Sequence, residues 1–428
     1  MTRSTDLLVL GNGAAGSAAA FAAKKQDPSL SVLIVSREAE PEYSVPALPD
    51  LLSGELTREK VLVRSLSDYE NAGIGLLFKD VVRIDPGGRF AELANGDRIA
   101  YRELILASGS QPIQLRRMKG TDLPGNFVMK TMGDVDAMAS YPGKSAVVVG
   151  SGAIGIEGSM ALKERGYEKV TMVEALEWLS PKSLDRETSD ELKAVLERFG
   201  VEVLTGEAVQ GVLGEEKVGG VVTEKRTIPC DLVLWGIGMR PETALAKDAG
   251  IAAGSLGGIC VDDHMRTNVP HIYACGDCAE FPDILSGMPA LHLFWEPAQR
   301  GGAAAGVNAA GGDRAYLGSA AVFLTNKGGL TICAFGKTES ELDRRCGLVL
   351  EERRGEIYRR LLLEDGRLKG VQMVGSLQDI DLFMGCIRRN ALQKPDAWDM
   401  TVRIPDEALG SVRDAVFFLR RARRAAVK

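Results

Sequence analysis

Short apolar runs, each followed by a glycine-rich turn and a segment of small residues, recur along the chain. Residues 7–10 (LLVL) show no polar alternation, which is typical of a strand buried on both faces of a parallel sheet. Residues 14–25 then predict an alanine-rich helix, and residues 31–35 (SVLIV) predict a second strand. The pattern therefore predicts an α/β fold that opens with a β–α–β unit.

The turn between the first strand and helix has G-x-G-x-x-G spacing. The first glycine permits a tight turn, the second lets a pyrophosphate approach the backbone, and the third lets the helix pack on the strand. The phosphates would lie at the helix N-terminus, where free N–H groups and the helix dipole attract anions. The alternative is a glycine-rich turn that only packs. The candidate cofactor contacts are Gly11, Gly13, Ala14, Ala15 and Gly16.

Residues 145–155 (SAVVVGSGAIG) repeat this pattern, with a strand at 147–149, a helix over 154–166 and a strand at 170–173. Two such units in one chain are more specific than one and imply two bound dinucleotides. The candidate contacts of the second unit are Gly150, Gly152, Ile154 and Gly155.

A carboxylate follows the second strand of each unit and is placed to bind a ribose hydroxyl. Glu174 stands directly at the strand end, and no Arg or Lys follows it at 175 or 176, which predicts a preference for NADH over NADPH. Glu38 lies two residues beyond the first unit's strand end, and its alternative role is that of a solvated loop charge.

The remaining chain predicts further strands and helices. Residues 104–112 and 231–241 each run from strand to glycine turn to proline, and residues 272–277 (IYACGD) end a short strand on Gly-Asp. A helix is expected over 295–308. From residue 315 the alternation changes to an α+β pattern, with strands near 321–325, 330–335, 347–351 and 357–363 and a helix near 378–391. The tail, 406–428, predicts an amphipathic, arginine-rich helix with Val412, Val416, Phe417 and Leu419 on one side.

Composition narrows the setting. The 428 residues carry a net charge of −6, which offers no basic field for nucleic acid, and no run of 18 apolar residues predicts a membrane span. The first strand begins almost at once, so we expect no signal peptide. Seven cysteines, an odd count, argue against a disulfide framework and favour the cytoplasm.

These motifs, over roughly residues 5–400, resemble the FAD- and NAD(P)-dependent pyridine nucleotide–disulfide oxidoreductases. The stretch 259–280 is similar to that family's second FAD motif, in which Asp277 would hold the ribityl chain of the flavin. The segment 43–46 (YSVP) and the α+β region look most like NADH:rubredoxin reductases and the FAD portion of nitrite reductases. The resemblance adds these candidate cofactor contacts: Pro46, Ala107, Ser108, Gly109, Gly238, Gly276 and Trp295.

The resemblance also implies two Rossmann-like dinucleotide-binding domains, one inserted in the other, and a C-terminal α+β domain. FAD would bind residues 1–112 and 241–312, and NADH the inserted residues 113–240. The α+β domain would cover 313–405, followed by the tail helix at 406–428. The nicotinamide would stack on the flavin where the two dinucleotide-binding domains meet.

Three departures from the family pattern bear on mechanism. No cysteine precedes Cys230, so a thiol relay beside the flavin is not expected. Asp50 stands near the position where related ferredoxin reductases carry a lysine that pairs with the glutamate matching Glu157. Glu157 is therefore the candidate catalytic residue, in contact with the nicotinamide. The Cys275-x-x-Cys278 motif lacks a second pair of ligands, so we expect no metal site.

The sequence thus predicts an oxidoreductase that passes hydride from NADH to FAD and electrons to a separate carrier, such as rubredoxin, ferredoxin or an iron–sulfur subunit. An NADH oxidase or small-molecule disulfide reductase is one alternative, and a non-catalytic interaction subunit is another. The pattern leaves open whether the chain forms a homodimer.

Overall fold

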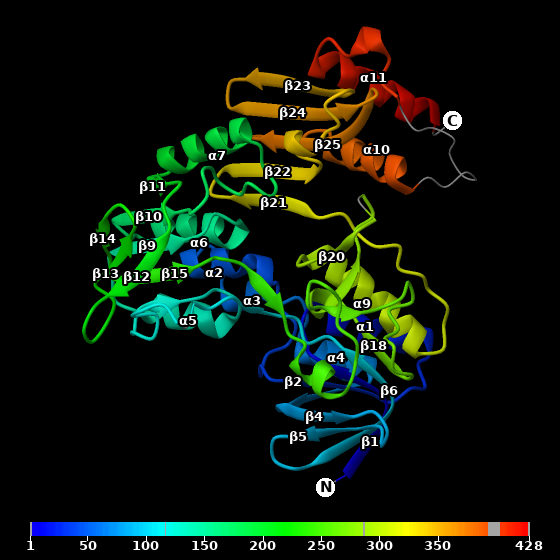
Figure 1. Cartoon of the computed structure of the whole chain (residues 1–428). Coiled ribbons are helices and arrows are strands. Elements are labelled where there is room, and N and C mark those ends of the chain that lie inside the picture. Colours follow the sequence, from blue (N-terminus) through cyan, green and yellow to red (C-terminus); the bar gives the residue numbers. More distant parts are fainter. Residues whose placement is uncertain (1, 116, 286, 393–402, 427–428) are drawn as a thin grey trace. The chain divides into compact units, whose positions relative to one another are not determined.

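The computed structural model describes residues 2–115, 117–285, 287–392 and 403–426. Figure 1 shows a mixed α/β chain. It divides into two compact units. Unit 1 comprises residues 1–47, 56–111 and 239–319, and unit 2 comprises residues 48–55, 112–238 and 320–428. Among the described helices, none has the length and apolar character needed to cross a membrane.

The centre of unit 1 is a sheet built around the strand predicted first. Strand β1 pairs in parallel with β2 and β6, and β18 extends the parallel part beside β6. Residues 7–10 are at most 5% exposed, as their unbroken apolar run predicts. The order β3-β2-β1-β6-β5-β4 uses β1 (Thr2–Leu10), β2 (Val32–Ser36), β3 (Ile74–Phe78), β4 (Val81–Asp85), β5 (Phe90–Leu93) and β6 (Arg98–Leu106), with β18 (Ile272–Ala274) off this path.

Two helices of unit 1, α1 (Ala14–Gln26) and α9 (Trp295–Ala309), pack at very short range (Figure 1). A Cβ atom at Gly302 would lie 2.2 Å from the carbonyl oxygen of Ala15, and one at Gly306 would lie 2.0 Å from that of Ala19. Larger side chains at these positions would force the helices apart. The glycines of α9 therefore fix α1 and the loop that precedes it.

Smaller elements complete unit 1. They are η1 (Val45–Ala47), α3 (Arg58–Val61), α4 (Leu66–Ala72), α8 (Ala244–Asp248), β17 (Ile259–Cys260), η2 (Gly276–Cys278), β19 (Ala279–Pro282) and β20 (Pro289–Leu291). Strands β7 (Ser110–Pro112) and β16 (Met239–Pro241) pair with each other where the chain passes between the two units.

Unit 2 contains a second parallel sheet, in the order β11-β10-β9-β15-β8. Its strands are β8 (Asn126–Phe127), β9 (Ser145–Val149), β10 (Lys169–Val173), β11 (Val201–Leu204) and β15 (Leu232–Trp235). Helices α5 (Met132–Ser140), α6 (Ala153–Glu164) and α7 (Arg186–Arg198) belong to the same part, with the small sheet β12 (Val209–Leu213), β13 (Gly220–Thr223) and β14 (Thr227–Pro229).

An antiparallel sheet forms the C-terminal part of unit 2, in the order β21-β22-β25-β24-β23. Its elements are β21 (Val322–Lys327), β22 (Leu330–Gly336), η3 (Glu339–Glu341), β23 (Gly347–Arg354), β24 (Ile357–Glu364), β25 (Arg367–Val374) and α10 (Ile380–Leu392). Strand β25 was not predicted, although it is the centre of the sheet. The buried side chains of Arg359, Arg360 and Gln372 interrupt the apolar alternation of β24 and β25.

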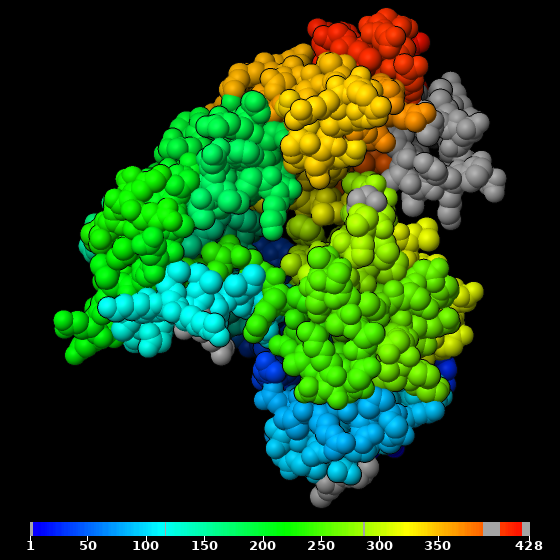
Figure 2. Space-filling model, in the orientation of Figure 1, coloured from blue at the N-terminus to red at the C-terminus, as the bar shows by residue number. Residues whose placement is uncertain are grey.

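The tail differs from its prediction in two ways. Residues 406–408 form the short turn η4 (Asp406–Ala408), and helix α11 begins only at Val412 (Val412–Ala426). Ser411 caps this helix, because its hydroxyl accepts a hydrogen bond from the Asp414 N–H. Phe417 was wrongly placed on the apolar side. It is 61% exposed, because it lies about 100° around the helix from Val416, whereas Val416 and Leu419 are buried. The surface of α11 adjoins that of β23 and β24 (Figure 2).

Candidate dinucleotide-binding sites

The first glycine loop (residues 11–16) contains glycines of two kinds. Gly11 has a φ of +110°, and a Cβ there would lie 2.2 Å from the Ala107 carbonyl oxygen; a Cβ at Gly16 would lie 1.9 Å from the Gly11 carbonyl oxygen. The fold itself therefore requires these two glycines. Gly13 has an ordinary φ of −79°, and no atom lies within 4 Å of a Cβ built there. No contact among the described residues requires this glycine, whereas a group that approaches the backbone from outside would.

The second glycine loop (residues 150–155) repeats this stereochemistry in unit 2. Gly150 has a φ of +98° and would bring a Cβ to 2.6 Å from the Gly236 carbonyl oxygen, and Gly155 would bring one to 2.0 Å from the Gly150 carbonyl oxygen. Gly152 has a φ of −71° and open space around its Cβ position. Each loop thus presents one glycine backbone and a helix N-terminus, α1 or α6, to an incoming group.

Residues far apart in sequence surround the first loop. Ala107 packs against Gly11, and a Cβ at Gly276, which has a φ of +74°, would lie 2.7 Å from the Ala15 Cβ. The Ser110 hydroxyl donates a 2.6 Å hydrogen bond to the Asp277 carboxylate. Unit 1 therefore brings the Gly-Asp motif, the 107–110 turn and the start of α1 into one place.

The other candidates of unit 1 lie nearby in sequence but differ in exposure. Glu38 is exposed, and its carboxylate accepts a 2.7 Å hydrogen bond from the Tyr43 hydroxyl. Pro46 is exposed within η1, and Gly109 has a φ of +72° in the turn after β6. The Ser108 hydroxyl donates to the Glu242 carbonyl oxygen at 2.6 Å. Trp295, the first residue of α9, packs on the core of unit 1.

A buried polar network behind the first loop was not predicted. The Asn12 amide donates to the Glu40 carbonyl oxygen at 3.2 Å and accepts from the Tyr69 hydroxyl at 3.0 Å. The Glu42 carboxylate accepts from the Ser17 hydroxyl at 2.5 Å and forms a 2.9 Å ion pair with Arg64. Burial raises the pKa of Glu42 despite these contacts. The network holds the loop and the first turn of α1 in place.

Glu174, directly after β10, is held against the second glycine loop by hydrogen bonds. Its carboxylate accepts from the Ser151 N–H at 3.0 Å, from the Ser151 hydroxyl at 2.6 Å and from the Leu176 N–H at 2.9 Å. These hydrogen bonds fix the carboxylate beside the second glycine loop. Ile154 is half-buried in the first turn of α6, and Gly238 has a φ of +112° in the turn after β15.

Comparison with known proteins decides the family. A family model described as pyridine nucleotide-disulphide oxidoreductase matches residues 5–310. The chain belongs to this family. It is 30% identical over 392 residues to an NADH oxidase from Methanocaldococcus jannaschii, covering 86% of this chain and 87% of that protein. It is 26% identical over 398 residues to an NADH-rubredoxin oxidoreductase from Clostridium acetobutylicum, covering 93% and 97%. The structure of a ferredoxin reductase from Rhodopseudomonas palustris has a TM-score of 0.85 at 23% identity, covering 98% and 99%, which shows a shared fold.

The resemblance inferred from sequence is thereby confirmed, and with it an oxidoreductase activity. Members of this pyridine nucleotide-disulphide oxidoreductase family use FAD and NAD(P)H, which are therefore the cofactors of the chain. The open Cβ positions at Gly13 and Gly152 fit two such dinucleotides, because a pyrophosphate needs close access to the backbone at a helix N-terminus.

Glu157 lies one turn into α6, beyond the second glycine loop. Burial raises the pKa of its carboxyl to about 7, and the charge of Asp50 raises it further, whereas the nearby Thr325 hydroxyl and the charge of Lys327 lower it. Asp50 forms a 2.8 Å ion pair with Lys327. Lys327 was not predicted as part of the site, because a lysine in a strand 170 positions after Glu157 carries no sequence signal of this contact.

The cysteines of the C-x-x-C motif are fully buried in unit 1. Burial raises the pKa of Cys275 well above its usual value and also raises the pKa of Cys278. The Cys278 thiol donates weakly to the Cys275 carbonyl oxygen at 3.3 Å. Thiols in this state are poor nucleophiles and poor metal ligands, which fits the interpretation that the pair is structural.

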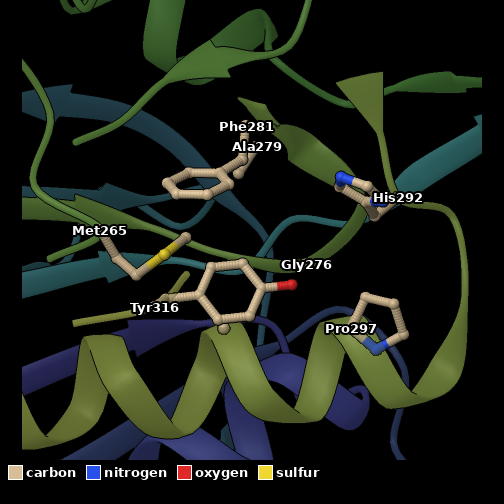
Figure 3. A pocket seen from close by; sticks show the side chains of 8 residues that line it. Met265, Gly276, Ala279, Phe281, His292, Pro297 and Tyr316 are labelled. Carbon is tan, nitrogen blue, oxygen red and sulfur yellow. The ribbon is translucent and has the colours of Figure 1, made fainter. Parts of the chain in front are cut away.

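A small cavity of about 20 Å³ lies along α9 in unit 1, with room for a water molecule (Figure 3). Tyr316, Phe281, Met265 and Pro297 line it, together with His292. Neither ring nitrogen of His292 has a hydrogen-bond partner of good geometry among the described residues, and burial lowers its pKa. A neutral imidazole facing this cavity fits a buried water.

Proposed function

We propose that the chain is an NADH:acceptor oxidoreductase, with FAD bound at the first glycine loop, NADH at the second, and electrons delivered to a separate one-electron carrier. One observation carries the proposal: each loop has a glycine with open space at its Cβ position, which no contact within the described part of the chain requires. FAD, when bound, accepts a hydride from NADH and can release its electrons singly. The two glycine-rich units would then be Rossmann-like domains, the second inserted in the first.

The residues of the chain supply binding and electrostatics. Asp277, oriented by Ser110, would accept hydrogen bonds from the ribityl hydroxyls. The N-terminus of α9 would stabilise negative charge on a reduced flavin. Glu174, fixed by Ser151, would bond the 2′-hydroxyl of NADH and repel the 2′-phosphate of NADPH.

A carrier protein is favoured as acceptor because the two cysteines of the Gly-Asp motif, among the described residues, are enclosed in the core of unit 1. No cysteine precedes Cys230, and Cys275 and Cys278 are enclosed with raised pKa values. The relationship to an NADH-rubredoxin oxidoreductase supports the same acceptor class. The 30% identity to an NADH oxidase favours dioxygen as a second candidate acceptor.

An anaerobic titration with NADH, followed by mixing with rubredoxin, ferredoxin, a small disulfide or dioxygen, separates these acceptors. We expect FAD reduction to stop at two electrons, without the charge-transfer band of a thiolate–flavin pair, and reoxidation to be fastest with an iron–sulfur or rubredoxin-type carrier. Uptake of more than two electrons would indicate a redox-active thiol. Reoxidation that is fastest with dioxygen would assign the oxidase activity instead.

A further inference from the structure

Lys327 is an enclosed cation of unit 2, with only 3% of its side chain exposed. Its ammonium lies 2.6 Å from the Glu164 carboxylate, 2.8 Å from Asp50 and 3.1 Å from Glu55. Burial alone would lower the pKa of Lys327, but hydrogen bonds with Asp50, Glu164 and Glu55 outweigh burial and raise it. One positive charge therefore balances three carboxylates that would otherwise repel one another.

The register of β21 on α6 places this cation on the face of α6 that carries Glu157, where its charge acts on the Glu157 carboxyl. Thr325 and Lys327 are two residues apart and share one face of β21, while Glu157 and Glu164 are seven apart and share one face of α6. The Thr325 side chain lowers the pKa of the Glu157 carboxyl, and Lys327 forms an ion pair with Glu164. The contact is tight, because a Cβ at Gly328 would lie 2.9 Å from the Glu164 Oε1.

Helix α2 (Leu48–Ser53) carries Asp50, the negative charge that pairs with Lys327. A 2.9 Å hydrogen bond from Arg165 to the Leu52 carbonyl oxygen holds α2 against the rest of unit 2. Lys327 adds an ion pair with Asp50 and a hydrogen bond to the Ser53 hydroxyl. Two charged groups on neighbouring elements act on Glu157: Asp50 of α2 opposes its ionisation, and Lys327 of β21 favours it.

We propose that Lys327 is a positioning residue for dinucleotide binding: it fastens α2 to α6 and supplies a positive charge on the face of α6 that carries Glu157. The inference rests on the proposed function, because Glu157 stands one turn beyond the loop that we assign to NADH. Asp50 and Lys327 should then shift the ionisation of Glu157 in opposite directions, and with it the pH dependence of NADH binding.

The test uses the full FAD-loaded chain and compares Lys327→Met with Asp50→Asn across pH. We expect the inflection of the KM for NADH to move up by about one pH unit in Lys327→Met, and down in Asp50→Asn. Lys327→Arg should restore most of the wild-type profile. Lys163→Met is the matched control, because Lys163 also lies on α6 but donates to the Glu168 carbonyl oxygen, and its inflection should stay unchanged.

A second readout needs no NADH. Hydrogen exchange of residues 48–55 should rise at least tenfold in Lys327→Met and stay unchanged in Lys163→Met. Unchanged exchange together with an unchanged inflection in Lys327→Met, or shifts of the same sign in Lys327→Met and Asp50→Asn, would overturn the inference. If the wild-type chain fails to oxidise NADH, the proposed function fails, whereas the exchange experiment still reports on Lys327.

Discussion

Gly13→Ala should weaken FAD binding while leaving the stability of the fold almost unchanged. The residue caps the N-terminus of α1 with a φ of −79° and a ψ of −171°, which alanine adopts without strain, and the added methyl group meets no atom within 4 Å. Alanine is a poorer N-cap than glycine by a few tenths to about 1 kcal/mol. Alanine also lowers the conformational entropy of the unfolded chain relative to glycine, which raises the free energy of unfolding by about 0.4–1 kcal/mol. We therefore expect the free energy of unfolding to change by less than about 1 kcal/mol.

FAD binding should respond quite differently. A methyl group at Gly13 stands where a pyrophosphate would approach the backbone, and each charge-assisted hydrogen bond that it prevents is worth about 1.5–3 kcal/mol. Loss of about 3 kcal/mol weakens binding roughly a hundredfold. Equilibrium binding of FAD to the apoprotein, with a thermal melt of the same apoprotein, measures both quantities. Gly152→Ala should keep its FAD and instead raise the KM for NADH.

Gly16→Ala is the contrasting variant. Its Cβ would lie 1.9 Å from the Gly11 carbonyl oxygen, so α1 would have to move away from the sheet, and we expect loss of soluble folded protein. The reasoning is refuted if Gly13→Ala binds FAD as tightly as the wild-type chain, or if Gly13→Ala unfolds as Gly16→Ala does.

Three further changes test the remaining groups. Glu174→Ala should narrow the preference for NADH over NADPH in kcat/KM while FAD stays bound, and a wild-type preference for NADPH would contradict the role of Glu174. Replacing Cys275 and Cys278 with alanine should change NADH-driven ferricyanide reduction by less than about tenfold, and a loss above about a hundredfold with FAD retained would imply a catalytic thiol. Glu157→Gln should melt at a higher temperature than wild type at pH 8, with a smaller difference at pH 5. The raised folded-state pKa of about 7 means that the stability contributed by protonated Glu157 is present below its ordinary pKa and is lost as pH rises through 7, by up to about 3 kcal/mol. Equal differences at both pH values would contradict this.

The parallel sheets were predictable because their strands are buried on both faces. Residues 7–10 and 147–149 are unbroken apolar runs, and such runs rarely occur outside buried strands or helices. The glycine spacings then fixed where each helix begins. The sheet at the C-terminus was harder, because buried Arg360 and Gln372 bond partners on other elements, Glu187 and Asp185, and so break the expected alternation in sequence.

The residues of the candidate site likewise fall into those with a local sequence signal and those explained only by distant contacts. Gly13 and Gly152 were predicted from local spacing, because the strand end, the turn and the helix start that position each of them are adjacent in sequence, whereas Asp277 was predicted from the family resemblance. Glu42 and Lys327 were not found, because each is explained only by partners on other elements. A lone charge in a sequence most often marks a solvated surface, and only the fold shows that these two are enclosed.

Two opposite charges act on the carboxyl of Glu157 from different elements. Asp50, which stands near the position where the family resemblance implies a lysine, opposes the ionisation of Glu157. Lys327, from a strand far away in sequence, favours that ionisation and forms an ion pair with Asp50. What acts on Glu157 is the sum of nearby charges and burial, which keeps its pKa close to 7. The position of a residue in a motif is therefore weaker evidence for its role than the charge balance that the fold assembles around it.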